Sequence, residues 1–96
     1  MTEKNKKEPL YFFIISDSAG ETASKLAQAT MAQYPTVEFE IFRRTFITTK
    51  EALIKALTDA KKCDAIILHT LINEELVTLA DHFCEASELF HFDVLT

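Results

Sequence analysis

Two runs of this chain are apolar at every position: LYFFII at residues 10–15 and AIIL at residues 65–68. A strand that exposes one face to water alternates polar and apolar residues, whereas a strand covered on both faces is apolar throughout. Strands of the second kind lie in the middle of parallel sheets that carry helices on both sides. The two runs therefore predict two central strands of a parallel sheet and an α/β fold.

Helical periodicity separates the predicted strands. Residues 19–34, 49–60 and 73–87 each carry an apolar stripe with the spacing of an α-helix. In chain order, the stripes consist of Ala23, Leu26, Ala27, Thr30, Met31 and Tyr34; of Leu53, Ala56, Leu57 and Ala60; and of Leu76, Leu79, Ala80 and Phe83. Pro35 is expected to end the first helix, because proline cannot continue an α-helix.

Three helix starts are predicted from capping patterns. Ser18 with Glu21, and Thr48 with Glu51, have the spacing of a capping box, in which the two side chains satisfy backbone N–H groups at the start of a helix. Asn73 is a favourable N-cap for the third helix.

Two further segments, VEFEIF at residues 37–42 and FHFDVL at residues 90–95, alternate in polarity and predict strands nearer the edges. The predicted order is βαβαβαβ. Short connections in this order favour a three-layer parallel sheet of about four strands with helices on both faces, similar to half of a Rossmann or flavodoxin-like fold. The apolar last strand is expected to leave an edge that favours a homodimer.

The chain is expected to form a single domain. Residues 1–9 are charged and polar and end at a proline, so they predict a disordered tail, and residues 10–96 predict one α/β domain. The chain stops one residue after an apolar strand. We therefore expect it to be the N-terminal fragment of a longer polypeptide.

Composition and charge exclude several classes of protein. A net charge of −5 argues against a nucleic-acid-binding surface. No segment approaches the roughly 20 apolar residues of a membrane span, and the charged N-terminus has no apolar core typical of a signal peptide, so no membrane partner and a cytoplasmic location are expected. Cys63 and Cys84 are expected to be reduced and at least partly buried.

Polar residues follow each of the first three predicted strands. The carboxyl ends of parallel strands meet at one edge of a sheet, and ligands of such sheets bind where the strand order reverses. Hydroxyls, guanidinium groups, an imidazole and helix N–H groups suit a phosphate or a carboxylate. The candidate anion-binding residues are Ser16, Asp17, Ser18, Gly20 and Thr22 after the first strand, Arg43 and Arg44 after the second, and His69 and Thr70 after the third.

Each candidate also has an interpretation without a ligand. The loop at residues 16–22 can be a helix cap alone, and Asp17 can form an Asx turn. Arg43 and Arg44 can be solvated charges, and His69 can hydrogen-bond a neighbouring loop. The loop matches neither G-x-G-x-x-G nor G-x-x-x-x-G-K-[ST], so a phosphate cradle of those kinds is excluded. No catalytic residue can be assigned from spacing alone.

A metal site is not predicted. Asp81, His82, Cys84 and His91 are residue types that bind metals. However, a helix separates His82 from Cys84 by about 200° around its axis, and no spacing in the group matches a common zinc site.

The segments FFIISDSAGETASKLAQATMAQYP, EFEIFRRTFI, AIILHTL followed by NEEL, and FDVL resemble the N-terminal region of a family of bacterial and plastid regulators. These proteins regulate pyruvate, phosphate dikinase and phosphoenolpyruvate synthase. The resemblance implies a bifunctional serine/threonine kinase and pyrophosphorylase. An ADP-dependent reaction phosphorylates a threonine of the target enzyme, and a phosphate-dependent reaction removes that phosphate and yields pyrophosphate.

The resemblance also limits what this chain does alone. The family's nucleotide-binding P-loop, of the type G-x-x-x-x-[ST]-K-[ST], lies beyond the point where this chain ends, so we expect no activity and no cofactor in these 96 residues. ADP and phosphate are implied for the full-length family. The domain is expected to serve dimerisation, target binding or part of a phosphate site. A stand-alone module that senses an anion or nucleotide, or a purely structural interaction module, remains an alternative.

Overall fold

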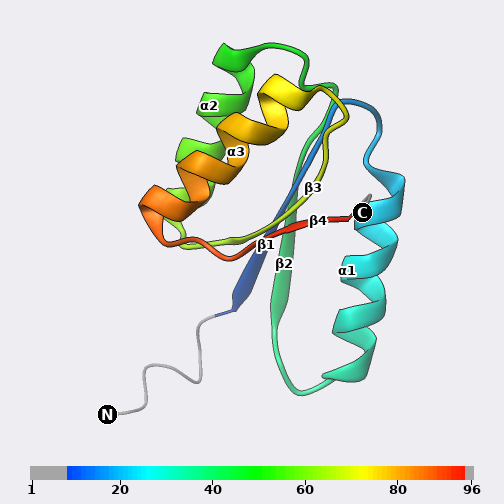
Figure 1. Cartoon of the computed structure of the whole chain (residues 1–96). Helices are drawn as coiled ribbons and strands as arrows, with labels where there is room; N and C mark the ends of the chain where they lie inside the picture. The colour runs from blue at the N-terminus through cyan, green and yellow to red at the C-terminus, as the bar shows by residue number, and fades with distance from the viewer. Residues whose placement is uncertain (1–8, 95–96) are drawn as a thin grey trace.

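The computed structural model describes residues 9–94 of the chain (Figure 1). Its elements are β1 (Leu10–Ser16), α1 (Glu21–Gln33), β2 (Phe39–Arg44), α2 (Lys50–Lys62), β3 (Ile66–Thr70), α3 (Glu74–Ser87) and β4 (His91–Asp93). The predicted order βαβαβαβ is confirmed. The predicted tail, residues 1–9, lies outside the described residues except for Pro9.

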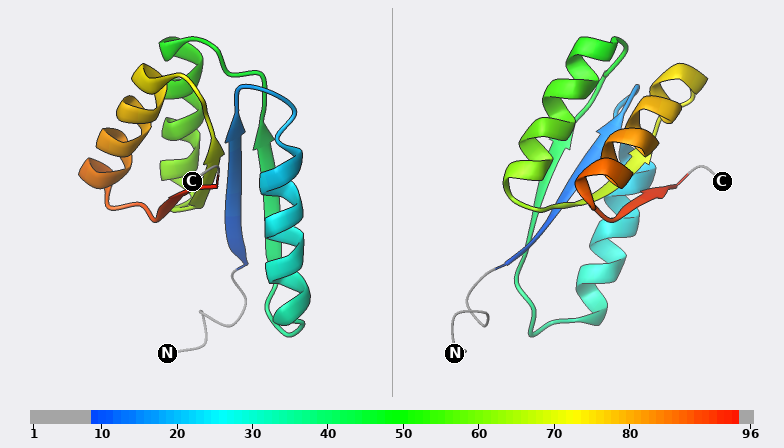
Figure 2. Two further views of the ribbon diagram at one scale, coloured as in Figure 1. Left: turned by 45° about the vertical axis from the view of Figure 1, so that its right-hand side comes forward. Right: turned by 60° about the vertical axis from the view of Figure 1, so that its left-hand side comes forward.

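The four strands form one parallel sheet in the order β2-β1-β3-β4. Figure 2 shows α1 on one face of this sheet and α2 and α3 on the other. The three-layer arrangement, a Rossmann-like half, is therefore confirmed. Because β1 pairs with β2 on one side and β3 on the other, the chain reverses its winding direction at the carboxyl end of β1.

The apolar runs are continuous because the two central strands are buried on both faces. Along β1, Phe13 and Ile15 pack in the layer of α2 and α3, and Phe12 and Ile14 pack in the layer of α1. Full burial of one such side chain stabilises the fold by about 1.5–3 kcal/mol. Ile67 and Leu68 of β3 divide between the same two layers.

Both predicted capping boxes are wrong. The N-cap of α1 is Gly20, with φ 74°, and no side chain of the described residues caps this helix. The N-cap of α2 is Thr49, whose hydroxyl accepts from the Ala52 N–H at 3.1 Å. In both segments the helix therefore begins one or two residues later than the S-x-x-E and T-x-x-E spacings predict. The third prediction is confirmed, since the Asn73 side chain accepts from the Leu76 N–H at 3.1 Å.

The predicted stripe of α1 is only partly buried. Ala23 and Ala27 are buried as expected, but Ser24 is buried beside them, and Leu26 and Tyr34 are exposed. Only one helix of the described chain covers this face, so the sheet beyond it stays open. Leu26 borders a hollow of about 500 Å³ there, which the sheet residues Phe12, Leu68 and Phe92 also line. None of the helices in residues 9–94 is both long enough and apolar enough to cross a membrane.

Candidate functional site

Three hydroxyl side chains meet where β1 and β3 end. The Thr70 hydroxyl donates to Ser16 Oγ at 2.7 Å, and the Ser18 backbone N–H donates to the same oxygen at 3.0 Å. Ser18 Oγ lies 3.2 Å from Ser16 Oγ. Ser16 is fully buried. We call Ser16, Ser18 and Thr70 the hydroxyl network; it ties the loop after β1 to the end of β3.

The same loop is held from both neighbouring connections. The Phe46 and Ile47 N–H groups donate to the carbonyls of Ser18 and Ser16 at 3.0 and 2.9 Å. On the other side, the Ile72 N–H donates to the Asp17 carboxylate at 3.0 Å. The Asp17 side chain therefore reaches the β3 connection, where the sequence had also allowed a local Asx turn. These contacts fix the loop in place without a ligand.

Gly20 is required at the start of α1. Its φ of 74° is in the left-handed region, and a Cβ on this residue would lie 3.1 Å from Ile14 Cγ2 and 3.5 Å from both Ser16 Cβ and Thr45 Cγ2. Any other residue would be strained by its backbone and crowded by its neighbours. Because no side chain of the described residues caps α1, its first-turn N–H groups are available to an anion.

A hollow of about 360 Å³ opens at this helix end, and we call it the loop hollow. It is lined by Asp17, Ser18, Ala19, Gly20, Glu21, Thr22, Thr70 and Ile72. Three hydroxyls and two carboxylates contribute to this lining, and no Lys or Arg is among these residues. The structure thus brings together Asp17, Ser18, Gly20, Thr22 and Thr70 of the predicted set around one opening, with Ser16 directly beneath them.

The two predicted arginines point to different layers. Arg43 Nε donates to Ser24 Oγ of α1 at 2.9 Å. Arg44 lies on the opposite face, where its guanidinium carbon is 5.0 Å from the centre of the Phe13 ring and an Arg44 nitrogen is 3.8 Å from an Asp59 oxygen of α2. The expected convergence of both guanidinium groups on the loop after β1 is therefore wrong. Successive residues of a strand face opposite sides of the sheet.

His69 also faces away from the loop hollow. Its neighbours are Asp81 of α3 and His91 of β4, in the layer of α2 and α3. The imidazole is fully buried, and neither ring nitrogen has a hydrogen-bond partner within the described part of the chain, so the expected bond to a neighbouring loop is wrong. Burial lowers the pKa of His69, against the opposing effects of Asp93 and Asp81. The sequence analysis considered Asp81 and His91 together with His82 and Cys84 but did not include His69, although the two-residue period of β3 already separates His69 from Thr70.

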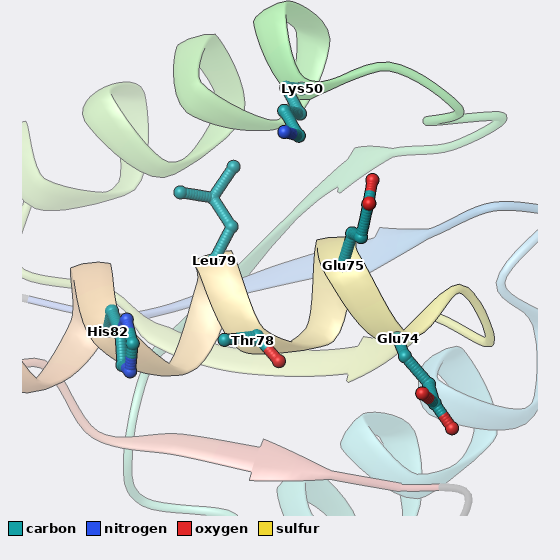
Figure 3. Close-up of a pocket in the computed structure, with 6 residues that line it drawn as sticks. All are labelled: Lys50, Glu74, Glu75, Thr78, Leu79 and His82. Carbon is teal, nitrogen blue, oxygen red and sulfur yellow. The ribbon is translucent and has the colours of Figure 1, made fainter.

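A second hollow, of about 490 Å³, lies between α2 and α3. In Figure 3, Glu75 and Leu79 of α3 point toward Lys50 of α2. Glu74, Thr78 and His82 complete the lining. Every charged group there is exposed, so this hollow is a solvated depression between two helices and not a built site.

Comparison with known proteins gives one consistent result. Residues 12–96 match the family described as kinase/pyrophosphorylase. A protein of Enterococcus faecalis named as pyruvate, phosphate dikinase regulatory protein 2 is 61% identical over 84 residues, which cover 88% of this chain and 30% of that protein. A Latilactobacillus sakei protein named as regulatory protein 1 of the same enzyme is 37% identical over 92 residues, covering 96% of this chain and 33% of that protein.

A third relative, the pyruvate, phosphate dikinase regulatory protein of Pediococcus pentosaceus, is 40% identical over 94 residues, covering 98% of this chain and 35% of that protein. The chain thus spans about a third of the length of the curated relatives it matches. The match covers nearly all of the described fold, including the loop after β1. The chain therefore belongs to the kinase/pyrophosphorylase family.

Proposed function

We propose that the complete protein regulates pyruvate, phosphate dikinase by reversible phosphorylation. In one direction, ADP supplies the phosphoryl group for a threonine of the target enzyme; in the other, inorganic phosphate removes that group and forms pyrophosphate. The family match over residues 12–96 and the printed names of the relatives support this proposal. Phosphoenolpyruvate synthase is the alternative target of such a regulator. We also propose that the protein is cytoplasmic, where it would contact either of these target enzymes.

Within this protein, the chain contributes a phosphate contact at the loop hollow. The observation that carries this role is the start of α1, whose first-turn N–H groups have no side-chain cap among the described residues and border the hollow. A helix N-terminus attracts anions through these donors and through its dipole. Ser18 and Thr22 add hydroxyl donors beside them.

Catalysis needs groups that this chain does not supply. Phosphoryl transfer depends on a cradle for the nucleotide phosphates and on bound Mg²⁺, and the 96 residues contain no P-loop sequence. The dipole contributes only about 0.3–1 kcal/mol at an exposed site, and Asp17 and Glu21 oppose an anion. The isolated chain is therefore expected to bind phosphate weakly and to be inactive.

An NMR titration tests this role. Uniformly ¹⁵N-labelled chain would be titrated with phosphate, pyrophosphate and ADP, and the amides of residues 18–23 followed. Saturable shifts of these amides in the millimolar range are expected, with the His69 imidazole signals unmoved because that side chain faces the other layer. Ser18→Ala should weaken the response, and Ser87→Ala, at the far end of α3, should not. If residues 18–23 do not shift at millimolar ligand, the loop is no phosphate contact.

Protein docking at the same edge is the second candidate. Phe46 and Ile72 are 69% and 74% exposed, and they lie in the connections that hold the loop after β1 from its two sides. Large exposed apolar residues beside a site are typical of protein interfaces. The partner proposed for this surface is the target enzyme.

A binding assay separates the two candidates. Phe46→Ser and Ile72→Ser should weaken capture of pyruvate, phosphate dikinase by the chain, while the exposed control Ile54→Ser of α2 should not. Equal capture by all variants would remove this surface from consideration. The homodimer stays a prediction, which sedimentation of the chain over a range of concentrations would measure.

A further inference from the structure

Three potential ligand groups meet on the face of the sheet opposite the loop hollow. They are His69 from β3, Asp81 from α3 and His91 from β4, and we call them the His-Asp-His cluster. His91 Nδ1 lies 3.4 Å and His69 Nε2 lies 3.9 Å from Asp81 Oδ1. All the ligand atoms of the cluster lie within 4.8 Å of one another. The two imidazole rings are nearly parallel, with centroids 6.3 Å apart.

His69 is an unusual residue for its position. Its side chain is 0% exposed, and neither ring nitrogen has a hydrogen-bond partner in residues 9–94. Leaving a buried polar group unpaired destabilises a fold, because the group loses its hydrogen bonds to water and gains none in the protein. An apolar residue of similar volume would avoid this cost, as Ile67 does at the preceding position on the same face. Its Nε2 atom lies 3.9 Å from the Asp81 carboxylate, which is too far for a hydrogen bond.

We propose that the His-Asp-His cluster binds a divalent transition-metal ion of the zinc type. Two imidazoles and one carboxylate are a donor set that such ions favour, whereas Mg²⁺ and Ca²⁺ favour oxygen ligands alone. A tetrahedral zinc ion with bonds of about 2.0–2.2 Å holds its donors about 3.3–3.6 Å apart. The Asp81–His91 separation of 3.4 Å already fits, whereas the His69 nitrogen, 3.9 Å from the Asp81 oxygen, must move closer to its partners to bind the same ion.

The surroundings suit a cation. The side chains of Asp81 and His91 are 42% and 22% exposed, so an ion can enter from solvent, and water can complete its coordination. Asp93 is paired with His69 in the β3–β4 register, so a second carboxylate of the chain lies close to the cluster. Cys84, one turn beyond Asp81, is fully buried, and its sulfur does not belong to the group of ligand atoms that converge in the cluster.

The three ligands come from three elements, so the ion would join them. β4 is only three residues long and lies at the edge of the sheet. A metal bound to His91 and His69 would hold β4 against β3, and the bond to Asp81 would hold α3 over both. This role is structural and lies on the far side of the sheet from the proposed phosphate contact.

Zinc titration of the chelator-treated 96-residue chain tests the proposal. Imidazole ¹⁵N shifts report each histidine separately, and calorimetry gives the stoichiometry and affinity. We expect one equivalent to bind, the ring signals of His69 and His91 to shift, and those of His82 to stay unchanged. The melting temperature should rise with zinc and fall again with chelator.

Matched variants localise the site. Asp81→Asn and His91→Gln alter partly exposed side chains and should each lower zinc affinity by more than about tenfold, since even outer-shell partners change affinity 10–100-fold. His82→Gln on the exposed face of α3 and Cys63→Ser should leave affinity unchanged. The proposal is overturned if His69 does not shift at one equivalent, if both cluster variants bind like the parent chain, or if binding is lost with His82→Gln or Cys63→Ser.

Discussion

Thr70 and His69 are neighbours on β3, and both are buried, but their polar atoms have opposite situations. The Thr70 hydroxyl faces the layer of α1 and donates to Ser16 at 2.7 Å, within a network that is satisfied by the chain itself. The His69 imidazole faces the layer of α3 and has no hydrogen-bond partner among the described residues. A buried polar group whose hydrogen bonds are all made within the chain needs no further partner. A buried polar group without hydrogen bonds indicates that a partner, such as a bound ion, is missing.

The largest losses of stability are expected from substitutions in the core, where the layer of α2 and α3 can be compared with the layer of α1. Ile15 and Ile14 are adjacent on β1 and fully buried, but Ile15 packs under two helices and Ile14 under one. Truncation of a buried isoleucine to alanine costs about 2–5 kcal/mol, more where the surroundings cannot collapse. We expect Ile15→Ala to lower the free energy of unfolding by about 4 kcal/mol and Ile14→Ala by about 3 kcal/mol. Urea unfolding measures both losses. A larger loss for Ile14→Ala would contradict the expectation that the layer of α2 and α3 contributes more stability at β1 than the layer of α1.

The next effect concerns the loop hollow. Gly20→Val places a β-branched residue in the left-handed region, with its Cβ 3.1 Å from Ile14 Cγ2. We expect a loss of about 2–3 kcal/mol, because backbone strain and overpacking each cost about 1–3 kcal/mol. The matched control is Ala19→Val, at an exposed neighbouring position, which should cost less than about 1 kcal/mol. Similar losses for the two variants would show that the loop relaxes around a side chain at residue 20.

Ser16 provides the test of the satisfied network. Ser16→Ala removes the oxygen that accepts from both Thr70 and the Ser18 N–H. Leaving those donors unpaired is expected to cost about 2 kcal/mol. In Thr70→Val only one bond is lost, so about 1 kcal/mol is expected. Thermal unfolding of the two single variants and the double variant measures the coupling; a double variant equal to the sum of the singles would mean that the 2.7 Å bond carries no stability.

Unlike the preceding substitutions, His69→Leu is expected to stabilise the chain. In the presence of chelator, the substitution removes two unpaired ring nitrogens and retains an apolar side chain of similar volume. We expect the free energy of unfolding to rise by about 1 kcal/mol. In zinc, the parent chain should gain stability and the variant should not. A loss of stability in chelator would mean that the His69 imidazole is held by contacts that the substitution breaks.

The fold was predictable because its signals are regional. Continuous burial of β1 and β3 and the stripes of three helices are averages over many residues, so single exceptions such as exposed Leu26 do not change the outcome. Helix starts depend instead on one backbone conformation. The S-x-x-E spacing at Ser18 does not reveal that Gly20 adopts a positive φ two residues later and begins α1 itself.

The sequence predicted at which edge of the sheet the candidate residues lie, but not on which face of the sheet each side chain lies. The order of strands correctly predicts that the loops after β1 and β3 meet, as the hydroxyl network shows. The two-residue period of strands, applied to Arg43 and Arg44 or to His69 and Thr70, would have assigned each pair to opposite layers. The His-Asp-His cluster needed more, because the pairing of His91 with Ile67 beside His69 is set by tertiary packing.

The two cysteines give the smallest effect, and it sharpens the contrast between buried and accessible groups. Burial raises the pKa of Cys84 to about 11, from 9.0, and raises that of the half-buried Cys63 in the same direction. At neutral pH both the folded and unfolded states hold the Cys84 proton. As pH approaches 9 the unfolded state ionises first, so Cys84 makes stability fall as pH rises through 9 and up to about 11.

At pH 9 the expected loss from Cys84 is about 0.4 kcal/mol relative to pH 7, because half of an unfolded thiol with a pKa of 9.0 is then ionised. Urea unfolding at the two pH values measures it, with Cys84→Ala as the variant that lacks this contribution and Cys63→Ser as the variant that keeps it. Thiol labelling at pH 8 should modify Cys63 well before Cys84. Rapid labelling of Cys84 in the folded chain would show an accessible thiolate one turn from Asp81; a sulfur ligand would then compete with the imidazoles for the proposed zinc ion.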